Sequence, residues 1–430
     1  MDEIKAHAAA ASAVATLRRC ETIRERCAAI TAAVDAGRSA HFRLDRSRLA
    51  DVADRVATLT RSRFPDLRIP YHSRWRHFEA GGIDRKAELD AKLAGRTQVA
   101  VARARIDLAL VSVLLDAGAG PQWRYVESGR VYTRSEGLGV ASLRAFMAGT
   151  FSSDAGDPCR VDAKGLLRID TTGLAQAFQV DADNPLVGLD GRAALLRRLG
   201  QALREQPQMF TSEGQPGHLF DALTHHRHAP AIHGHRPLPV AQHHQVSAAR
   251  ILQALHDAFS SIWPSGQHLD AARELPLGDV WRHPHAGGAG LDAGWVPFHK
   301  LSQWLAYSLI EPFEWAGVTV TGLDALTGLP EYRNGGLLLD AGVIVPLADD
   351  FARRHWQPAD EAIVEWRALT VALIDELAPL VRHRLGVTPE QMPLACVLEG
   401  GTWGAGREIA KELRSDGGPP LAIASDGTVF

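Results

Sequence analysis

One stretch in the C-terminal half of the chain contains residue types that could form a small-molecule site. A cation, an indole, a phenol and an acid recur there at helical spacing, namely Lys300, Trp304, Tyr307 and Glu311. Side chains three and four residues apart are neighbours on one helical face, and this face is too polar and aromatic to be plain core. The apolar run 337–345 then carries a lone acid, Asp340. The stretch predicts a small-molecule pocket with an acid close to it.

Asp340 lies among apolar residues, where a carboxylate either finds partners or has its pKa moved by burial. Such an acid could stabilise an oxocarbenium ion or activate water, as in the cleavage of glycosyl bonds. It could equally be a helix cap or a salt-bridged structural acid. A second acid, Glu365, lies two residues before Arg367, so those two side chains cannot share a helical face. We predict Asp340 and Glu365 as the catalytic carboxylates.

Other side chains could hold the substrate. Lys300 and Arg333 are natural ligands for a phosphate or carboxylate group. Arg333 begins the Asn- and Gly-containing segment 333–336, which predicts a ligand-facing turn. The segment 70–78 mixes aromatic and basic residues, a composition that recognition loops favour. The predicted substrate-binding residues are Lys300, Gln303, Trp304, Arg333, Trp281, Trp75 and His41.

The histidine and cysteine patterns do not predict a metal or redox site. Eight of the nineteen histidines fall between His218 and His244, but their spacing matches no metal-binding helix motif such as HExxH. We interpret this run as a surface loop and expect neither a metal nor a cofactor. The four cysteines include no CxxC pair, which is typical of a reducing cytoplasm.

The composition narrows the class of protein. A chain of 430 residues with 46% hydrophobic and 23% charged residues can bury a substantial core. A formal net charge of -3 provides no basic face for nucleic acid. No run of about 18 apolar residues and no secretion signal occurs, so we expect a cytoplasmic protein that does not bind membranes. The composition is compatible with a homo-oligomer.

The periodicity of apolar residues predicts a mainly helical fold with few strands. We expect one long helix over 14–34 and further helices over 45–60, 87–117, 142–147, 173–178, 191–203, 248–262 and 361–385. Aromatic and β-branched residues on both sides of a Gly turn predict a β-hairpin over 123–132. Because the sequence has no convincing linker, we predict a single helical domain over 1–430. A His-rich insertion near 213–247 is the only possible domain boundary.

Several segments are long enough to point to a family. The strings FHKLSQW at 298–304, LTGLPEYRNGG at 326–336 and SDGTVF at 425–430, together with 213–217, 278–281 and 399–403, resemble the uracil-catabolism family of the ring-opening uracil degradation route. Members of that family are often described only as a domain of unknown function. The likeness extends over nearly the whole chain and implies a role on a ribosylated, ring-opened pyrimidine.

A second likeness concerns motif order. Segments 300–303, 326–327 and 365–368, with Asp340 between the last two, resemble the queuosine-nucleotide N-glycosylase family. That resemblance implies a helical core related to DNA glycosylases and an aspartate in the nucleoside pocket. Here Ala341 and Gly342 follow Asp340, where that family has an aromatic and a basic residue.

The hypothesis from the sequence is an N-ribosyl hydrolase of uracil catabolism. It would cleave the N-glycosidic bond of a ribosyl-urea-type nucleotide, a small-molecule substrate, giving urea or an acylurea and ribose 5-phosphate. The first alternative is a metal-dependent amidohydrolase of the same route, which would use the histidines. The second is a non-catalytic scaffold for other enzymes of that route.

Overall fold

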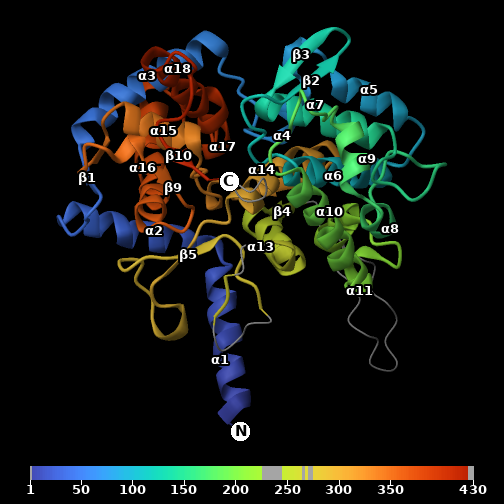
Figure 1. Cartoon of the computed structure of the whole chain (residues 1–430), viewed down its shortest axis with the longest axis horizontal. Helices are drawn as coiled ribbons and strands as arrows, with labels where there is room; N and C mark the ends of the chain where they lie inside the picture. Colours follow the sequence, from blue (N-terminus) through green and yellow to red (C-terminus); the bar gives the residue numbers. More distant parts are fainter. Residues whose placement is uncertain (1, 225–244, 264–266, 270–274, 425–430) are drawn as a thin grey trace.

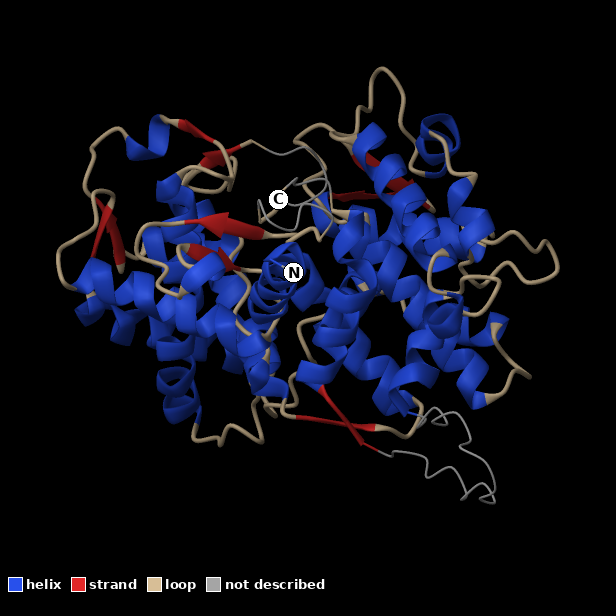
Figure 2. Cartoon of the chain, turned by 90° about the horizontal axis from the view of Figure 1, so that it is seen from below, coloured by secondary structure: helices blue, strands red, loops and turns tan. Residues whose placement is uncertain are grey.

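The computed structural model describes residues 2–224, 245–263, 267–269 and 275–424. Most of these residues are helical, and the strands are short (Figure 2), so the prediction of a mainly helical fold is confirmed. The α-helices are α1 (Asp2–Leu17), α2 (Cys20–Asp35), α3 (Leu49–Arg63), α4 (Arg74–Phe78), α5 (Arg85–Lys92), α6 (Gln98–Leu114), α7 (Arg134–Met147), α8 (Ala163–Leu167), α9 (Thr171–Ala177), α10 (Leu189–Arg204), α11 (Pro207–Phe210), α12 (Leu219–Thr224), α13 (Ala248–Phe259), α14 (Lys300–Trp315), α15 (Tyr332–Asp340), α16 (Glu361–Leu385), α17 (Leu394–Val397) and α18 (Trp403–Leu413).

One group of helices packs around α16, and we call it the α16 bundle. It consists of α2, α3, α15, α16 and α18, drawn in blue and in orange to red in Figure 1. Most of α16 is buried, because apolar residues occupy more than one of its faces and helices cover it on several sides. The bundle therefore joins segments from the two ends of the sequence.

A second group packs around α6, and we call it the α6 bundle. It contains α4, α7, α10 and α12, all in contact with α6, and lies on the other side of the molecule in Figure 1. Every residue from Ile106 to Leu114 is buried, because this helix is apolar all round and needs cover on every side. Helix α14 packs on α6, α13 and α4 and lies between the two bundles in Figure 1.

Over the residues that the structure describes, the strands form five two-stranded pairs. These are β1 (Phe42–Leu44) with β8 (Ile344–Pro346), β2 (Arg124–Glu127) with β3 (Arg130–Thr133), β4 (Gln245–Ser247) with β7 (Thr319–Thr321), β5 (Val280–Arg282) with β6 (Trp295–Pro297), and β9 (His355–Trp356) with β10 (Ala422–Ile423). The pairing of β2 with β3 is antiparallel, which confirms the predicted hairpin. In the described ranges, no helix has both the length and the apolar character needed to cross a membrane.

Two local predictions were wrong. The helix expected over 14–34 is two helices, α1 and α2, because the backbone of Arg19 is extended (φ -78°, ψ 145°) between them. The segment 333–336, expected as a turn, is the first turn of α15. Glu331 caps this helix, and a Cβ on Gly335 would overlap the ring of Trp366. This glycine therefore serves close helix packing.

Candidate functional site

Two pockets lie along α14. The smaller, which we call the central pocket, has a volume of about 140 Å³ and is lined by His72, His77, Asp116, Gly118, Ser135, Lys300, Leu301, Trp304, Leu329, Glu331, Tyr332 and Trp403. The larger, which we call the acidic pocket, has a volume of about 710 Å³, and Glu311, Glu314, Asp324 and Glu390 are among its lining residues. Of the predicted polar face of α14, Lys300 and Trp304 line the central pocket and Glu311 lines the acidic pocket. Tyr307 is instead fully buried and donates to the Thr327 carbonyl at 3.0 Å.

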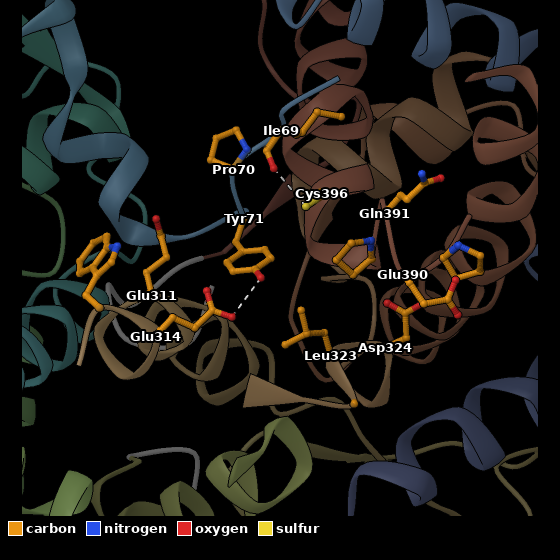
Figure 3. A pocket seen from close by; sticks show the side chains of 14 residues that line it. Ile69, Pro70, Tyr71, Glu311, Glu314, Leu323, Asp324, Glu390, Gln391 and Cys396 are labelled. Atoms are coloured by element: carbon orange, nitrogen blue, oxygen red, sulfur yellow. Dashed lines mark hydrogen bonds between the residues drawn. The ribbon is translucent and has the colours of Figure 1, made fainter. Parts of the chain in front are cut away.

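The acidic pocket presents mainly negative charge (Figure 3). Glu314 accepts a hydrogen bond from the Tyr71 hydroxyl at 3.1 Å, and burial raises the pKa of Glu314. Glu311 is already held by Arg76 at 2.8 Å. A pocket with this balance repels an anionic ligand. The central pocket, which offers buried groups of both signs and aromatic walls, is the better candidate for chemistry.

Six separate helices contribute residues to the central pocket or to its edge. His72 and His77 lie just before and within α4, Asp116 follows α6, Ser135 is on α7, and Lys300, Leu301 and Trp304 are on α14. The remaining wall comes from Glu331 and Tyr332 at the start of α15 and Trp403 at the start of α18. The pocket thus lies where the α6 bundle, α14 and the α16 bundle meet, a common place for small-molecule sites.

The backbone of α15 holds one acid of this pocket, Glu331, in a fixed position. Its two carboxylate oxygens accept the backbone N–H groups of Asn334 at 2.6 Å and Arg333 at 2.7 Å. Such caps hold a negative charge rigidly at a helix start. Burial raises the pKa of Glu331, while the two backbone N–H groups and Lys300 act in the opposite direction.

Lys300 supplies the positive charge of the pocket. Burial lowers the pKa of its amine, and so does the neighbouring charge of Arg367, whereas Glu331, Asp279 and Asp116 oppose the shift. The backbone N–H of Lys300 donates to Asp279 at 2.9 Å. Asp279 in turn receives two hydrogen bonds from Arg367, at 2.8 and 2.7 Å. This buried pair anchors the start of α14 and so fixes the position of Lys300.

Asp116 is a second acid at the pocket wall. Arg74, which is fully buried, forms an ion pair with it, and Ser135 donates a hydrogen bond to it at 3.3 Å. Burial nevertheless raises the pKa of Asp116 to about 6, against the opposing charge of Arg74. Near neutral pH this carboxyl group can therefore exist in both protonation states.

Aromatic rings form the rest of the wall. The His77 ring meets Trp304 edge-on at 5.5 Å, and the His72 ring stacks on Trp304 at 6.4 Å. Burial, followed by the charge of Arg74, lowers the pKa of His77 well below its ordinary value, so His77 is neutral. Flat rings with few charges suit the sugar or planar amide part of a ligand.

Three arginines flank the pocket residues along the chain. Arg134 precedes Ser135, Arg333 follows Tyr332, and Arg407 lies one turn beyond Trp403, with its guanidinium carbon 5.4 Å from the centroid of that ring. Burial lowers the pKa of Arg333, and the charges of Arg134 and Arg407 lower it further. Arg134 also has a left-handed backbone (φ 54°), a strain that often marks functional segments. Arg407 already pairs with Glu136 at 2.7 Å, and Arg333 donates to the Gly417 carbonyl at 3.1 Å. A phosphate bound by these cations would add to those partners.

The structure places the two predicted catalytic acids outside the central pocket. Asp340 ends α15, at the opposite end from Glu331, about 13 Å away by the rise of a helix. It receives two hydrogen bonds from Arg414, one of them at 2.9 Å. Glu365 is buried on α16, where it accepts a hydrogen bond from Ser39 and lies 3.3 Å from His283.

The predicted binding residues divide into two sets. Lys300 and Trp304 line the central pocket, and Arg333 directly follows its wall. The others have structural partners elsewhere: the Trp281 indole donates to Asp279, the Trp75 indole donates to the Ser308 carbonyl, Gln303 exchanges hydrogen bonds with Thr327, and His41 lies 3.2 Å from Glu361. Trp281 still supports the pocket indirectly, because Asp279 anchors Lys300.

Ten of the twelve residues that line the central pocket were absent from the predicted set, among them His72, Asp116, Glu331 and Trp403. A signal existed for some of them. Asp116 is an acid directly after the mainly apolar run 108–115, and Glu331 directly precedes the segment that we expected to face a ligand. What the sequence could not provide was the packing of α4, α6, α15 and α18 around α14, which brings these residues together.

Of the His-rich run, the residues 225–244 lie outside the described part of the chain. In the part that is described, no group of three or more His, Cys, Asp or Glu side chains is arranged to hold a metal ion. All four cysteines are free and buried. Burial raises the pKa of Cys27 and Cys396, which makes poor nucleophiles of them.

Comparison with known proteins adds a family match. The model of a family described as "Protein of unknown function (DUF1688)" matches residues 16–430. The chain is 39% identical over 425 residues to "Uracil catabolism protein 4" of Lachancea kluyveri, covering 92% of this chain and 93% of that protein. It is 37% identical over 425 residues to "Protein urg3" of Schizosaccharomyces pombe (strain 972 / ATCC 24843), covering 97% and 99%.

Proposed function

The chain belongs to the DUF1688 family, and from this membership we propose that it takes part in uracil catabolism, the process after which one of its relatives is named. We assign it the hydrolysis of the N-glycosidic bond of a ribosyl-urea-type nucleotide. The products would be urea or an acylurea and ribose 5-phosphate. The central pocket would be the active site.

One observation carries this assignment: a carboxylate held by a helix start lines the same aromatic pocket as a half-buried lysine. Cleavage of a ribosyl C1′–N bond develops positive charge on the sugar, and a fixed carboxylate stabilises that charge. Glu331 can provide it, because two backbone N–H groups hold its oxygens in place. Trp304, Tyr332 and Trp403 would enclose the sugar and the urea group.

The reaction consumes one water molecule. The C1′–N bond breaks with its electron pair going to nitrogen, and a water oxygen bonds to C1′. Glu331 would take the proton that this water loses, while the leaving nitrogen gains a proton from a donor in the pocket. The 5′-phosphate would be bound by Lys300 and by the arginine group around Arg333.

The test compares two acids on the same helix. We expect the purified protein to release ribose 5-phosphate from synthetic ribosylurea 5′-phosphate, and Glu331→Gln to slow this release by about 100-fold or more, since one well-placed charge contributes about that much. Asp340→Asn is the matched control at the far end of α15. It should keep most of the activity, although it loses the ion pair with Arg414.

Two outcomes would contradict this assignment, and one control is needed. Loss of activity in Asp340→Asn with little loss in Glu331→Gln would return the catalytic role to Asp340. No release by the unaltered protein would reject the proposed reaction. Circular dichroism must show that Glu331→Gln keeps its helical content, because Glu331 also caps α15.

A further inference from the structure

The central pocket contains a histidine that a buried glutamate orients. His72 lines the pocket, is only 6% exposed, and has its Nδ1 atom 2.9 Å from a carboxylate oxygen of Glu399. A carboxylate can only accept, so Nδ1 carries the proton in this contact. Among the described residues, the other ring nitrogen, Nε2, has no hydrogen-bond partner. The Nε2 atom of His72 is therefore available to a ligand in the central pocket.

Glu399 is well placed to keep this orientation. Arg63 donates to its other carboxylate oxygen at 3.0 Å, so both oxygens of Glu399 are occupied. Burial alone would raise the pKa of Glu399, but the hydrogen bonds and charges of His72 and Arg63 outweigh it and keep that pKa below its ordinary value. An ionised glutamate favours the charged form of a histidine beside it.

The backbone around Glu399 is unusual. Glu399 lies in a π-helical turn, Leu398–Thr402, that leads into α18. π-turns inside α-helices occur frequently at functional sites. Gly401 in this turn packs directly on α3, where a Cβ would lie 2.6 Å from a Val56 methyl carbon. The turn therefore sits firmly between α3 and the central pocket, and it positions Glu399 behind the His72 ring.

The second pocket histidine provides a contrast. No carboxylate in the described part of the chain is hydrogen-bonded to His77, whose Nδ1 atom lies 3.0 Å from a guanidinium nitrogen of Arg74. A neighbouring cation disfavours the protonated form of a histidine. Of the two histidines that line this pocket, only His72 has a carboxylate hydrogen-bonded to its ring among the described residues.

From this geometry we propose that His72 and Glu399 form an acid–base dyad in which His72 is the proton donor to the leaving nitrogen. This inference rests on the proposed function and completes its proton balance. As the C1′–N bond breaks, the Nε2 proton of protonated His72 moves to that nitrogen, and the ring becomes neutral with its proton on Nδ1. Glu399 is a positioning residue, because it acts through His72.

The leaving group tests this role. A proton donor matters for a poor leaving group such as urea nitrogen and little for p-nitrophenolate, which leaves as a stable anion. We expect His72→Asn to slow the cleavage of ribosylurea 5′-phosphate by about 100-fold to 10,000-fold. The same variant should slow the cleavage of p-nitrophenyl ribofuranoside 5-phosphate by less than about 10-fold. Glu399→Gln should show the same selectivity with a smaller loss.

His77→Asn is the matched control, because it removes the other pocket histidine. We expect it to slow both substrates by a similar factor. If His72→Asn also slows both substrates equally, His72 binds or stabilises and is not the proton donor, and the proposal is overturned.

A second measurement does not need activity. If the unaltered protein cleaves neither substrate, the proposed function fails, and nitrogen-15 NMR of the histidine rings then decides the dyad. If the dyad exists, neutral His72 carries its proton on Nδ1 in the unaltered protein, and Glu399→Gln shows a mixture of the two His72 tautomers. The Nε2 resonance of His72 also changes when ribose 5-phosphate is added. A tautomer that is indifferent to Glu399, or an Nε2 resonance that does not respond, overturns it.

Discussion

At the scale of single residues, Asp107 is a buried acid outside the central pocket. It lies within α6, is fully buried, and accepts the backbone N–H groups of Val161 at 3.1 Å and Gly217 at 2.6 Å as well as the Gln215 amide at 2.7 Å. Burial raises the pKa of Asp107 to about 7, although these three hydrogen bonds oppose the shift. The folded protein therefore holds this proton more tightly than the unfolded chain does.

This shift predicts a pH dependence of stability. Between about pH 4 and pH 7 the folded state binds a proton at Asp107 that the unfolded state has released, so the free energy of unfolding falls as the pH rises. Asp107→Asn, which cannot titrate, is the comparison. Urea denaturation should show this variant to be less stable than the unaltered protein at pH 5, by a margin that shrinks by about 1 kcal/mol or more at pH 8. A margin that stays constant would contradict the prediction.

Two residues predicted from the sequence, Lys300 and Trp304, line the central pocket. They were singled out because a cation and an indole at helical spacing mark a polar face. Asp340 was expected to be either a catalytic or a salt-bridged acid, and in the structure it pairs with Arg414. Its partner lies 74 positions further along the chain, so spacing alone could not decide between a catalytic and a structural role.

At the scale of elements, the contact between α15 and α18 brings one wall of the central pocket together. Gly406 of α18 lies so close to the carbonyl oxygen of Arg333 that a Cβ on it would overlap this oxygen. The close approach places Trp403 and Arg407 beside the start of α15, where Glu331 and Arg333 lie. The glycine therefore determines the distance between two helices that both contribute to the pocket.

Substitution of this glycine should affect both the fold and the pocket. We expect Gly406→Ala to lower the stability by about 1–3 kcal/mol through overpacking and to weaken ribose 5-phosphate binding, because α18 must move away from α15. Gly404→Ala, in the same helix, is the control, since the nearest atoms to its Cβ are the flexible side-chain ends of Leu59 at 3.0 Å and Arg63 at 3.4 Å. Thermal melts and titration calorimetry measure the two effects, and equal behaviour of both variants would contradict the prediction.

The elements themselves were largely predictable, and their ends were not. The long helix over 361–385 and the hairpin over 123–132 were expected, and α16, β2 and β3 confirm them. Periodicity did not reveal the break between α1 and α2, because apolar residues continue at helical spacing through Arg18 and Arg19. There the guanidinium of Arg18 donates to the Pro276 carbonyl at 2.9 Å, a partner 258 positions away that no local pattern can indicate.

At the scale of the whole molecule, α1 supports the start of α14 from a distance in sequence. The carbonyl oxygen of Leu17, at the end of α1, lies 2.9 Å from the His299 ring nitrogen, and His299 directly precedes Lys300. Val14 and Leu17 also join a small hydrophobic cluster with Leu277 and Trp295. Residues 6–9, in contrast, are exposed, and in Figure 1 this part of α1 projects from the rest of the molecule.

Two truncations separate these parts of α1. Removal of residues 1–9 should leave the melting temperature nearly unchanged, because no side chain described in that part is buried. Removal of residues 1–17 should cost several kcal/mol, since a buried Val or Leu contributes about 1.5–3 kcal/mol. It should also weaken the binding of ribose 5-phosphate at Lys300. Similar melting temperatures for the two truncations would contradict this account.

The α16 bundle also sets an order for folding during synthesis. Its helices α2 and α3 end at Arg63, whereas α15 begins at Tyr332, so roughly 270 residues leave the ribosome before the partners meet, which takes on the order of tens of seconds. During that interval the apolar faces of α2 and α3 have no native cover. The α6 bundle lies entirely within the intervening segment and can form first. For the newly made chain, the α16 bundle is thus the last part to close and the part most exposed to aggregation and to chaperones.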